Sequence, residues 1–120
     1  MYRINKIHQL PQILDMPNEV QQVITETVLI LETEYGPHLA NNGFGGFVVV
    51  LSSKEDLPSL QQLLSEFFID LEKVIPEYVE SVVCSDGQIF TNTLILCGSD
   101  FSIVIISPLS ITHEKLKEYM

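Results

Sequence analysis

Four hydrogen-bonding side chains lie close together in one short stretch of the chain. They are Tyr35, His38, Asn41 and Asn42, in the segment YGPHLANNGFGGF, which ends at Phe47. Histidine and tyrosine can transfer protons, and asparagine both donates and accepts hydrogen bonds. If the chain is a small enzyme or a ligand-binding protein, we expect its site in this loop from Tyr35 to Phe47. The Asn-Asn-Gly sequence also fits ordinary turn chemistry.

The glycines of this loop do not fit a phosphate site. They follow a helical pattern and precede an apolar strand pattern, and no Gly-Lys-Ser/Thr sequence follows them. Nucleotide-binding loops have the reverse order, because the backbone amides and the helix dipole must meet the phosphate. We expect these glycines to supply positive φ angles and to let the backbone lie close to a neighbouring strand. The sequence therefore predicts no cofactor.

Metal sites and nucleophilic catalysis are also not indicated. The histidines His8, His38 and His113 are scattered, and no pair has the spacing of a helix-borne metal site. The chain has no G-x-S-x-G sequence, and neither Cys84 nor Cys97 has a basic neighbour that would activate it. We therefore expect no catalytic residue and no metal site, and a non-catalytic function is favoured.

The charge balance is strongly acidic. The chain has 16 Asp and Glu residues against 6 Lys and Arg residues, and its formal net charge is −10. No Lys or Arg lies between Lys6 and Lys54, or between Lys73 and Lys115. Such a surface repels nucleic acid and anionic membranes and attracts basic proteins, although acidity also serves solubility.

Length and composition indicate one globular domain that covers residues 1–120. Hydrophobic residues make up 46% of the chain, which is enough for a core. The purest apolar run, Phe47 to Leu51, is far too short to span a bilayer, and polar residues and Pro11 interrupt the N-terminal segment, which does not resemble a signal peptide. We therefore expect a cytoplasmic protein.

The first half of the chain contains two helical patterns and one strand pattern. Pro17 to Tyr35 is predicted as a helix that Gly36 and Pro37 terminate, with the run from Val28 to Leu31 buried on almost all sides. Residues 47–51 are typical of a central strand that is covered on both faces. A second helix is expected to begin near Asp56, with this buried stripe: Leu57, Leu60, Leu63, Leu64, Phe67, Phe68 and Leu71. The first 16 residues fit a docked strand or a short turn.

The second half of the chain predicts an antiparallel meander. Its strands are Tyr78 to Cys84, Ile89 to Cys97 and Phe101 to Ile106, joined by turns at Asp86-Gly87 and near Ser99-Asp100. A short helix from about Ser110 to Glu118 follows, with Leu109, Leu116 and Met120 facing inward.

The assumption of two-residue hairpin turns leads to a predicted register, with these pairs: Cys84–Ile89, Val82–Thr91 and Ile95–Val104. One face of the meander is then apolar, and the other is mixed. We expect a helix to cover the mixed face, although a second subunit is the alternative. This register separates Cys84 from the partner position of Cys97 by about 26 Å, which is too far for a disulfide.

These patterns predict an α+β fold: about four strands in a mixed or antiparallel sheet, two main helices packed on it, and a short C-terminal helix. Three functions are compatible with the sequence. The favoured one is a non-catalytic protein-interaction module for a basic partner, of which small inhibitor or immunity-type proteins are one form by size and charge. The others are the enzyme or ligand binder with its site at Tyr35–Phe47, and a homodimeric structural subunit that uses the mixed sheet face.

Overall fold

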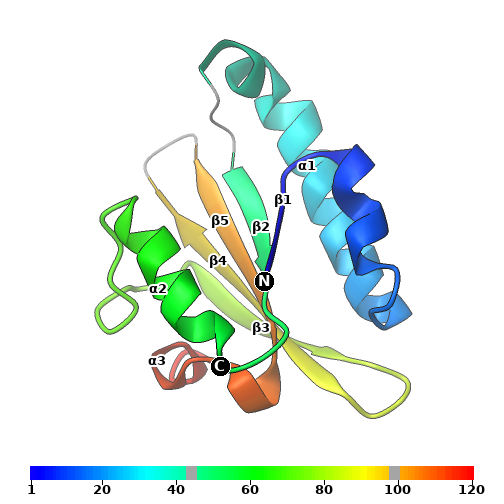
Figure 1. Ribbon diagram of the computed structural model, residues 1–120, viewed down its shortest axis with the longest axis vertical. Coiled ribbons are helices and arrows are strands. Elements are labelled where there is room, and N and C mark those ends of the chain that lie inside the picture. Colours follow the sequence, from blue (N-terminus) through cyan, green and yellow to red (C-terminus); the bar gives the residue numbers. More distant parts are fainter. Residues whose placement is uncertain (43–45, 98–100) are drawn as a thin grey trace.

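A five-stranded mixed sheet forms the centre of the computed structural model (Figure 1). The structure describes the backbone of residues 1–42, 46–97 and 101–120, and within these ranges it describes all side chains except those of residues 32–42. The elements follow in this order: β1 (Tyr2–Ile4), the 3-10 helix η1 (Ile7–Ile13), α1 (Asn18–Asn42), β2 (Gly46–Val50), α2 (Asp56–Ser65), β3 (Tyr78–Val83), β4 (Ile89–Leu96), β5 (Ser102–Pro108), the 3-10 helix η2 (Leu109–Ile111) and α3 (Glu114–Lys117).

The strand order is β1-β2-β5-β4-β3. β2 and β5 are parallel neighbours, and the other adjacent pairs are antiparallel. The predicted α+β class, the mixed sheet, the C-terminal meander and the short C-terminal helix are confirmed. The sheet has one strand more than expected, because the N-terminal segment docks as β1 beside β2.

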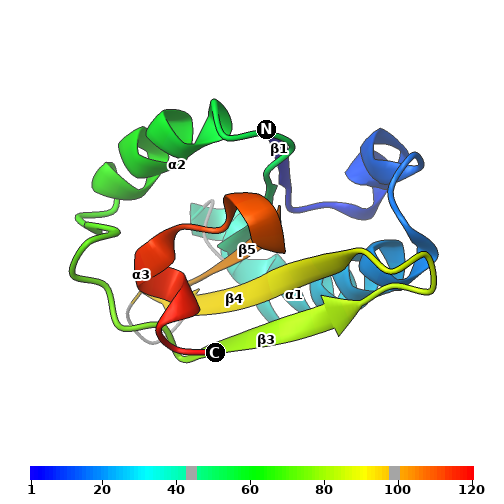
Figure 2. The same cartoon turned by 90° about the horizontal axis from the view of Figure 1, so that it is seen from below.

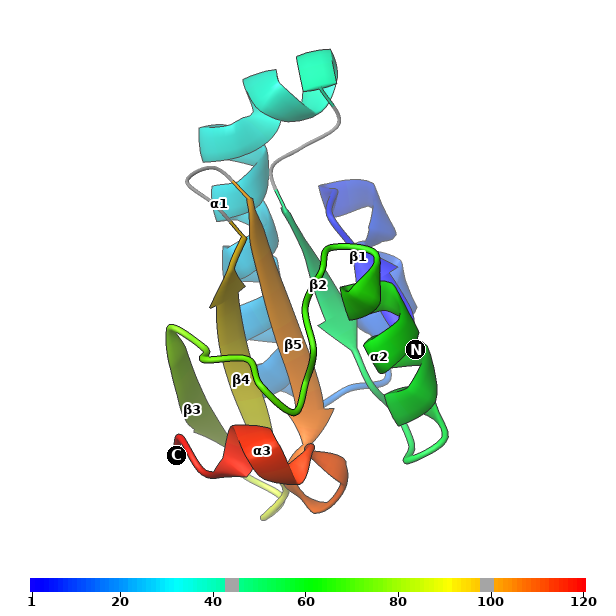
Figure 3. The same cartoon turned by 90° about the vertical axis from the view of Figure 1, so that its left-hand side faces the viewer.

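Helices cover both faces of the sheet, and two apolar clusters result. Figures 2 and 3 show α1 on one side and α2 with α3 on the other. The α1-side cluster consists chiefly of Val20, Ile24 and Val28 on α1 and of Val48, Val104 and Ile106 on the sheet. The α2-side cluster consists chiefly of Leu60 and Leu64 on α2 and of Val49, Ile103 and Ile105 on the sheet. β2 is therefore buried on both faces, as its continuous apolar run predicts.

The predicted end of α1 at Tyr35 is wrong. The helix continues through Gly36 and Pro37 to Asn42. A proline inside a helix removes one backbone donor and crowds the preceding turn, and this bends a helix as readily as it ends one. Figure 3 shows the axis of α1 changing direction in its final turns.

The predicted register of the meander is also wrong. The observed pairs are Val83–Ile89, Val82–Phe90 and Ile95–Ile103. At the β3–β4 turn, the amide of Cys84 donates to the carbonyl of Gln88 over 2.8 Å, and Gly87 has a φ of 91°. Three residues instead of two thus form the loop, and a shift of one residue exchanges the sheet faces. The predicted turn near Ser99-Asp100 lies outside the described residues.

Four apolar side chains expected in the core are exposed. Phe68 leaves the predicted stripe of the second helix because α2 ends at Ser65. Leu29 and Ile30 are exposed because α1 lies against the sheet with one side only. Met120 is exposed beyond the end of α3, whereas Leu116 is buried as predicted.

Candidate functional site

The predicted site residues belong to the end of a helix. Tyr35, His38, Asn41 and Asn42 all lie in the last turns of α1, so the first part of the expected loop is helical. Their side chains lie outside the described part of the structure, as do the positions of residues 43–45. A site at Tyr35–Phe47 therefore stays a prediction.

Gly46 behaves as predicted for a glycine at the beginning of a strand. Its φ is 122°, and a Cβ atom at this position would collide with the carbonyl oxygen of Ser102 on β5. The glycine thus allows β2 and β5 to approach each other.

A cleft of about 430 Å³ lies between the loop after α2 and the C-terminal segment, lined in part by Lys54, Glu72, His113 and Lys115. His113 Nδ1 accepts a hydrogen bond from the amide of Lys115 over 3.1 Å, and its Nε2 lies 3.1 Å from Glu72 Oε1. Because Nδ1 acts as the acceptor, the ring proton sits on Nε2 and is donated to Glu72. Both ring nitrogens are occupied, so His113 caps α3 and holds the Glu72 loop instead of serving as a base.

Three buried hydroxyls meet beneath this cleft. Thr91 Oγ1 lies 2.7 Å from Thr112 Oγ1 and 3.0 Å from Ser107 Oγ, and Ser107 Oγ lies 2.8 Å from Thr112 Oγ1. Thr112 also donates to the carbonyl of Pro108 over 3.0 Å. These hydroxyls bind one another and attach the C-terminal segment to the sheet. We assign them a structural role.

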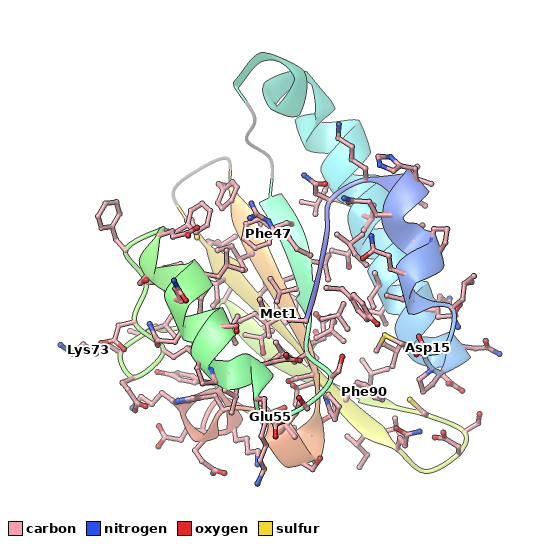
Figure 4. All side chains as sticks on the ribbon, in the orientation of Figure 1. Met1, Asp15, Phe47, Glu55, Lys73 and Phe90 are labelled. Atoms are coloured by element: carbon pink, nitrogen blue, oxygen red, sulfur yellow. The ribbon has the colours of Figure 1, made fainter. Side chains whose placement is uncertain are left out.

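An apolar cleft of about 570 Å³ lies where α2 ends and β4 approaches β5. Its lining includes Glu66, Phe67, Phe68, Leu96 and Cys97. Phe67 stacks on Phe101 with ring centroids 5.0 Å apart, and both rings also contact Phe47, which Figure 4 labels beside β2. This cluster gives the cleft a firmly packed aromatic floor.

Phe68 is the most unusual residue of the cleft. Its side chain is 99% exposed, and its φ is 63°, the only positive φ of a non-glycine residue among the described ones. The amide of Ile69 donates to the carbonyl of Leu64 over 3.0 Å, and the amide of Phe68 donates to Ser65 over 3.1 Å. Phe68 therefore occupies the left-handed position after a helix, where glycine is usual and where another residue costs roughly 1–2 kcal/mol. Helical periodicity predicts this residue in the core, so its exposure does not follow from the sequence pattern.

A smaller trough of about 240 Å³ lies between α1 and the start of β3. Thr27 and Ile30 line it from α1, and Tyr78, Leu94 and Leu96 line it from β3 and β4. Leu96 is exposed and also lines the cleft around Phe68. The two apolar surfaces therefore meet at this residue.

The charges of the molecule are unevenly distributed. The segments from Ile7 to Ser53 and from Val74 to Glu114, which include α1 and the whole meander, contain no Lys or Arg. The basic residues belong to the N-terminal segment, the loops that flank α2, and α3: Arg3, Lys6, Lys54, Lys73, Lys115 and Lys117. Figure 4 shows Lys73 on the α2 side and Asp15 beside the start of α1. The α1 side of the meander is thus acidic and without cations of its own.

Neither a membrane-spanning helix nor a cluster of metal-binding side chains is found among the described residues. Within these ranges, no helix combines the length and the hydrophobicity that crossing a bilayer requires. The same residues contain no group of three or more histidine, cysteine or carboxylate side chains placed to hold a metal ion.

Comparison with known proteins produced no match to a family model, a curated protein or a solved structure. Function therefore has to be inferred from the clefts, charges and contacts of the chain itself.

Proposed function

We propose that this protein is a non-catalytic interaction module that binds a basic partner protein. The observation that carries the proposal is Phe68, which is fully exposed in a left-handed conformation at the rim of an apolar cleft. Strained backbone and a solvent-exposed aromatic ring both cost stability, and such costs persist mainly where function requires them. Aromatic side chains are also the residues that most often dominate binding energy at interfaces.

The charge distribution supports a basic partner. Glu66 lines the cleft beside Phe68, and Asp70 follows two residues later. The protein has a net charge of −10, which accelerates the approach of a basic protein and opposes association between two copies. We expect the partner to insert an apolar surface against Phe68 and Leu96 and to surround it with Lys and Arg.

An inhibitor or immunity-type protein that masks a basic active site is one form of this function. That comparison rests on size and charge alone. Both cysteines are free thiols, which is usual in a reducing compartment, so we expect the interaction in the cytoplasm. The scattered Lys and Arg residues support neither nucleic acid nor an anionic membrane as the partner.

The proposal is tested by affinity capture from the native cell with three baits: the unmodified chain, Phe68→Gly and Leu14→Ala. Leu14 is an exposed apolar residue next to η1, remote in sequence from the cleft, and serves as the matched control. We expect a basic protein to be captured by the unmodified chain and by Leu14→Ala, and to be lost with Phe68→Gly.

Two results would contradict the proposal. One is a captured protein that binds Phe68→Gly as well as the unmodified chain. The other is a partner that is itself acidic, or binding that does not weaken when the salt concentration rises, because charge attraction between exposed groups is screened by salt.

A further inference from the structure

The strand β3 forms one edge of the sheet, and its outer side is open. The strand order β1-β2-β5-β4-β3 leaves β3 paired with β4 alone. Figure 2 shows β3 as the outermost strand at that edge. The strand runs from Tyr78 to Val83, and its register with β4 contains no bulge. A strand with one unpaired side carries backbone donors and acceptors that another extended chain can use.

The backbone groups of Ser81 and Val83 point to the open side. The amide of Cys84 donates to the carbonyl of Gln88 over 2.8 Å, so these two residues form a hydrogen-bonded pair at the end of the ladder. Hydrogen-bonded and non-hydrogen-bonded pairs alternate along an antiparallel ladder, so Val83 and Ser81 do not bond to β4. Both residues are exposed, and no other hydrogen bond to their amides is found among the described residues.

The two edges of the sheet differ in their protection. At the opposite edge, β1 has only three residues, and Arg3 lies at its centre. Short edge strands and cations are two devices that prevent a sheet from pairing with another chain. β3 contains no Lys, Arg or Pro, although its residue Val79 is covered, at 8% exposure. The stretch from Glu80 to Val83, exposed except for the half-buried Val82, is therefore accessible to another chain.

The charges around this edge favour a basic chain over a second copy. Glu80 is the only charged residue of β3, and Glu77 and Asp86 lie just before the strand and in the turn after it. No Lys or Arg occurs between Val74 and Glu114. A second copy would bring the same carboxylates to the pairing edge without a cation to balance them. A strand that carries Lys or Arg would meet these carboxylates with the opposite charge.

We propose that β3 pairs with an extended segment of the basic partner protein, which adds a strand to the sheet. The identity of this segment rests on the proposed function, but the open edge does not. In strand addition, main-chain hydrogen bonds supply affinity, and side-chain contacts supply specificity. The amides and carbonyls of Ser81 and Val83 are the main-chain groups that β3 offers.

Glu80 determines the chemistry of the added segment. In an antiparallel addition, Ser81 and Val83 form the hydrogen-bonded pairs, so Glu80 belongs to a non-hydrogen-bonded pair, in which opposing side chains are closest. A Lys or Arg opposite Glu80 is attracted, and a carboxylate there is repelled. The side chain of Val83 is 66% exposed on the other face, and it favours an apolar residue opposite itself.

The open edge is continuous with the proposed interface at Phe68. Tyr78, the first residue of β3, lines the trough beside α1, and Leu96 lines both this trough and the cleft that contains Phe68. A chain antiparallel to β3 runs from Val83 toward Tyr78 and then reaches this cleft. One partner segment can therefore pair with β3 and place an apolar side chain against Phe68.

The test is amide hydrogen exchange, measured by NMR on the full chain at low salt with two peptide probes. One is an acetylated and amidated hexapeptide of alternating valine and lysine, and the other has glutamate in place of lysine. We expect the lysine peptide, at saturation, to slow the exchange of the Ser81 and Val83 amides at least about tenfold, because both gain an acceptor. The Val82 amide already bonds to β4, and its exchange should change less than about twofold. The glutamate peptide should protect neither Ser81 nor Val83.

The variants Ser81→Pro and Ser81→Ala separate strand addition from general charge attraction. Proline removes the outward amide without the loss of a bond to β4, and edge strands tolerate proline in this position. Ser81→Pro should therefore fold but not bind the lysine peptide, whereas Ser81→Ala, which keeps the amide, should bind it as the unmodified chain does. If Ser81→Pro does not fold, Val83→Lys and Val83→Glu replace this pair: the first should repel the lysine peptide, and the second should retain it.

Four results would overturn the proposed pairing. They are unchanged exchange of Ser81 and Val83 with the lysine peptide, equal protection by both peptides, equal binding by Ser81→Pro and Ser81→Ala, and protection of Ser81 in a dimer of the chain without any peptide. The last result would identify a second copy as the occupant of the edge.

Capture of the partner distinguishes this pairing from the interaction at Phe68. A partner that is lost with Phe68→Gly but retained with Ser81→Pro would refute the pairing at β3 and leave the proposed function intact. Protection of Ser81 by the lysine peptide, without any partner captured by the unmodified chain, would refute the proposed function and leave the pairing edge intact.

Discussion

Gly46 on β2 and the carbonyl oxygen of Ser102 on β5 approach so closely that no side chain fits between them. A Cβ atom on Gly46 would overlap the Ser102 carbonyl and would also lie 3.0 Å from Leu31 of α1. The contact sits at the first register pair of the parallel β2–β5 ladder. One glycine thus sets the distance between the two most buried strands and the helix that covers them.

We expect Gly46→Ala to lower the free energy of unfolding by about 3 kcal/mol, because the overlap with backbone adds to the strain of a positive φ. Gly87→Ala is the matched control: its φ is also positive, at 91°, but nothing lies within 4 Å of the added Cβ. It should cost about 1 kcal/mol, the strain alone. Urea denaturation measures both. Equal losses of free energy of unfolding in the two variants would show that the overlap with the Ser102 carbonyl adds nothing to the destabilisation.

Strand identity followed from the sequence because it depends on local composition. The continuous β-branched run of β2 indicates burial on two faces whatever the rest of the chain does, and both faces are buried. The end of α1 could not be inferred in this way. Gly36 and Pro37 locally favour the end of a helix, but α1 continues past both residues to Asn42.

The predicted register of the meander was wrong for a related reason. The sequence Asp86-Gly87 is compatible with both a two-residue and a three-residue turn. The two turns pair the strands β3 and β4 in registers that differ by one residue. The amide of Cys84 bonds to Gln88, which selects the longer loop. The candidate cleft was hidden for a similar reason, because the exposure of Phe68 depends on where α2 ends.

Replacement of Phe68 by glycine should stabilise the protein. The left-handed conformation costs a phenylalanine roughly 1–2 kcal/mol, and glycine avoids this cost while losing somewhat more chain entropy on folding. We expect a net gain of about 1 kcal/mol in urea denaturation. Phe67→Ala is the contrast, because Phe67 stacks on Phe101, and it should lose about 2 kcal/mol. A destabilised Phe68→Gly would contradict the view that this residue is retained for binding.

The buried hydroxyls of Thr91, Ser107 and Thr112 should stabilise the fold as one unit. Three hydroxyl protons serve these contacts, so removal of one oxygen changes the pairing of the other two. Thr91→Val should cost about 1–2 kcal/mol, and the Thr91→Val/Thr112→Val pair should cost less than the sum of the single changes. Ser110→Ala, at an exposed hydroxyl, should change stability by less than about 0.5 kcal/mol. Strict additivity in thermal or urea unfolding would show three independent bonds.

Asp56 should make stability depend on pH in the acidic range. The amide of Ser52 donates to Asp56 Oδ2 over 2.8 Å and holds the pKa of this carboxyl below its usual range, and the amide of Ser53 acts in the same direction. A carboxyl with a lowered folded-state pKa stabilises the fold fully above its unfolded pKa of about 4, and this contribution is lost as the pH falls through the lower folded value. Asp56→Asn should therefore lose about 1 kcal/mol at pH 7 and progressively less below pH 4.

The control for this pH dependence is Asp15→Asn. Asp15 is exposed and lies shortly before α1, and the Ser52 and Ser53 amides donate to Asp56 instead. The free energies of unfolding of the two variants, measured from neutral to acidic pH, should differ most at neutral pH. The difference should disappear at low pH. A constant difference at every pH would mean that the Ser52 contact does not act through the charge of Asp56.

Cys97 should report directly on the cleft around Phe68. Cys97 is partly exposed in that cleft, whereas Cys84 is buried in the α1-side core, and burial raises the pKa of both thiols. Because the thiolate is the reactive form, both should react more slowly than free cysteine at neutral pH and faster as the pH rises. With a thiol reagent such as DTNB we expect one reacting group, which Cys97→Ser removes and Cys84→Ser retains. A bound partner should protect Cys97, because its apolar surface would cover Leu96 and Phe68, which line the same cleft as the thiol. Reaction of Cys84 first, or unchanged labelling of Cys97 in the complex, would place the partner elsewhere on the molecule.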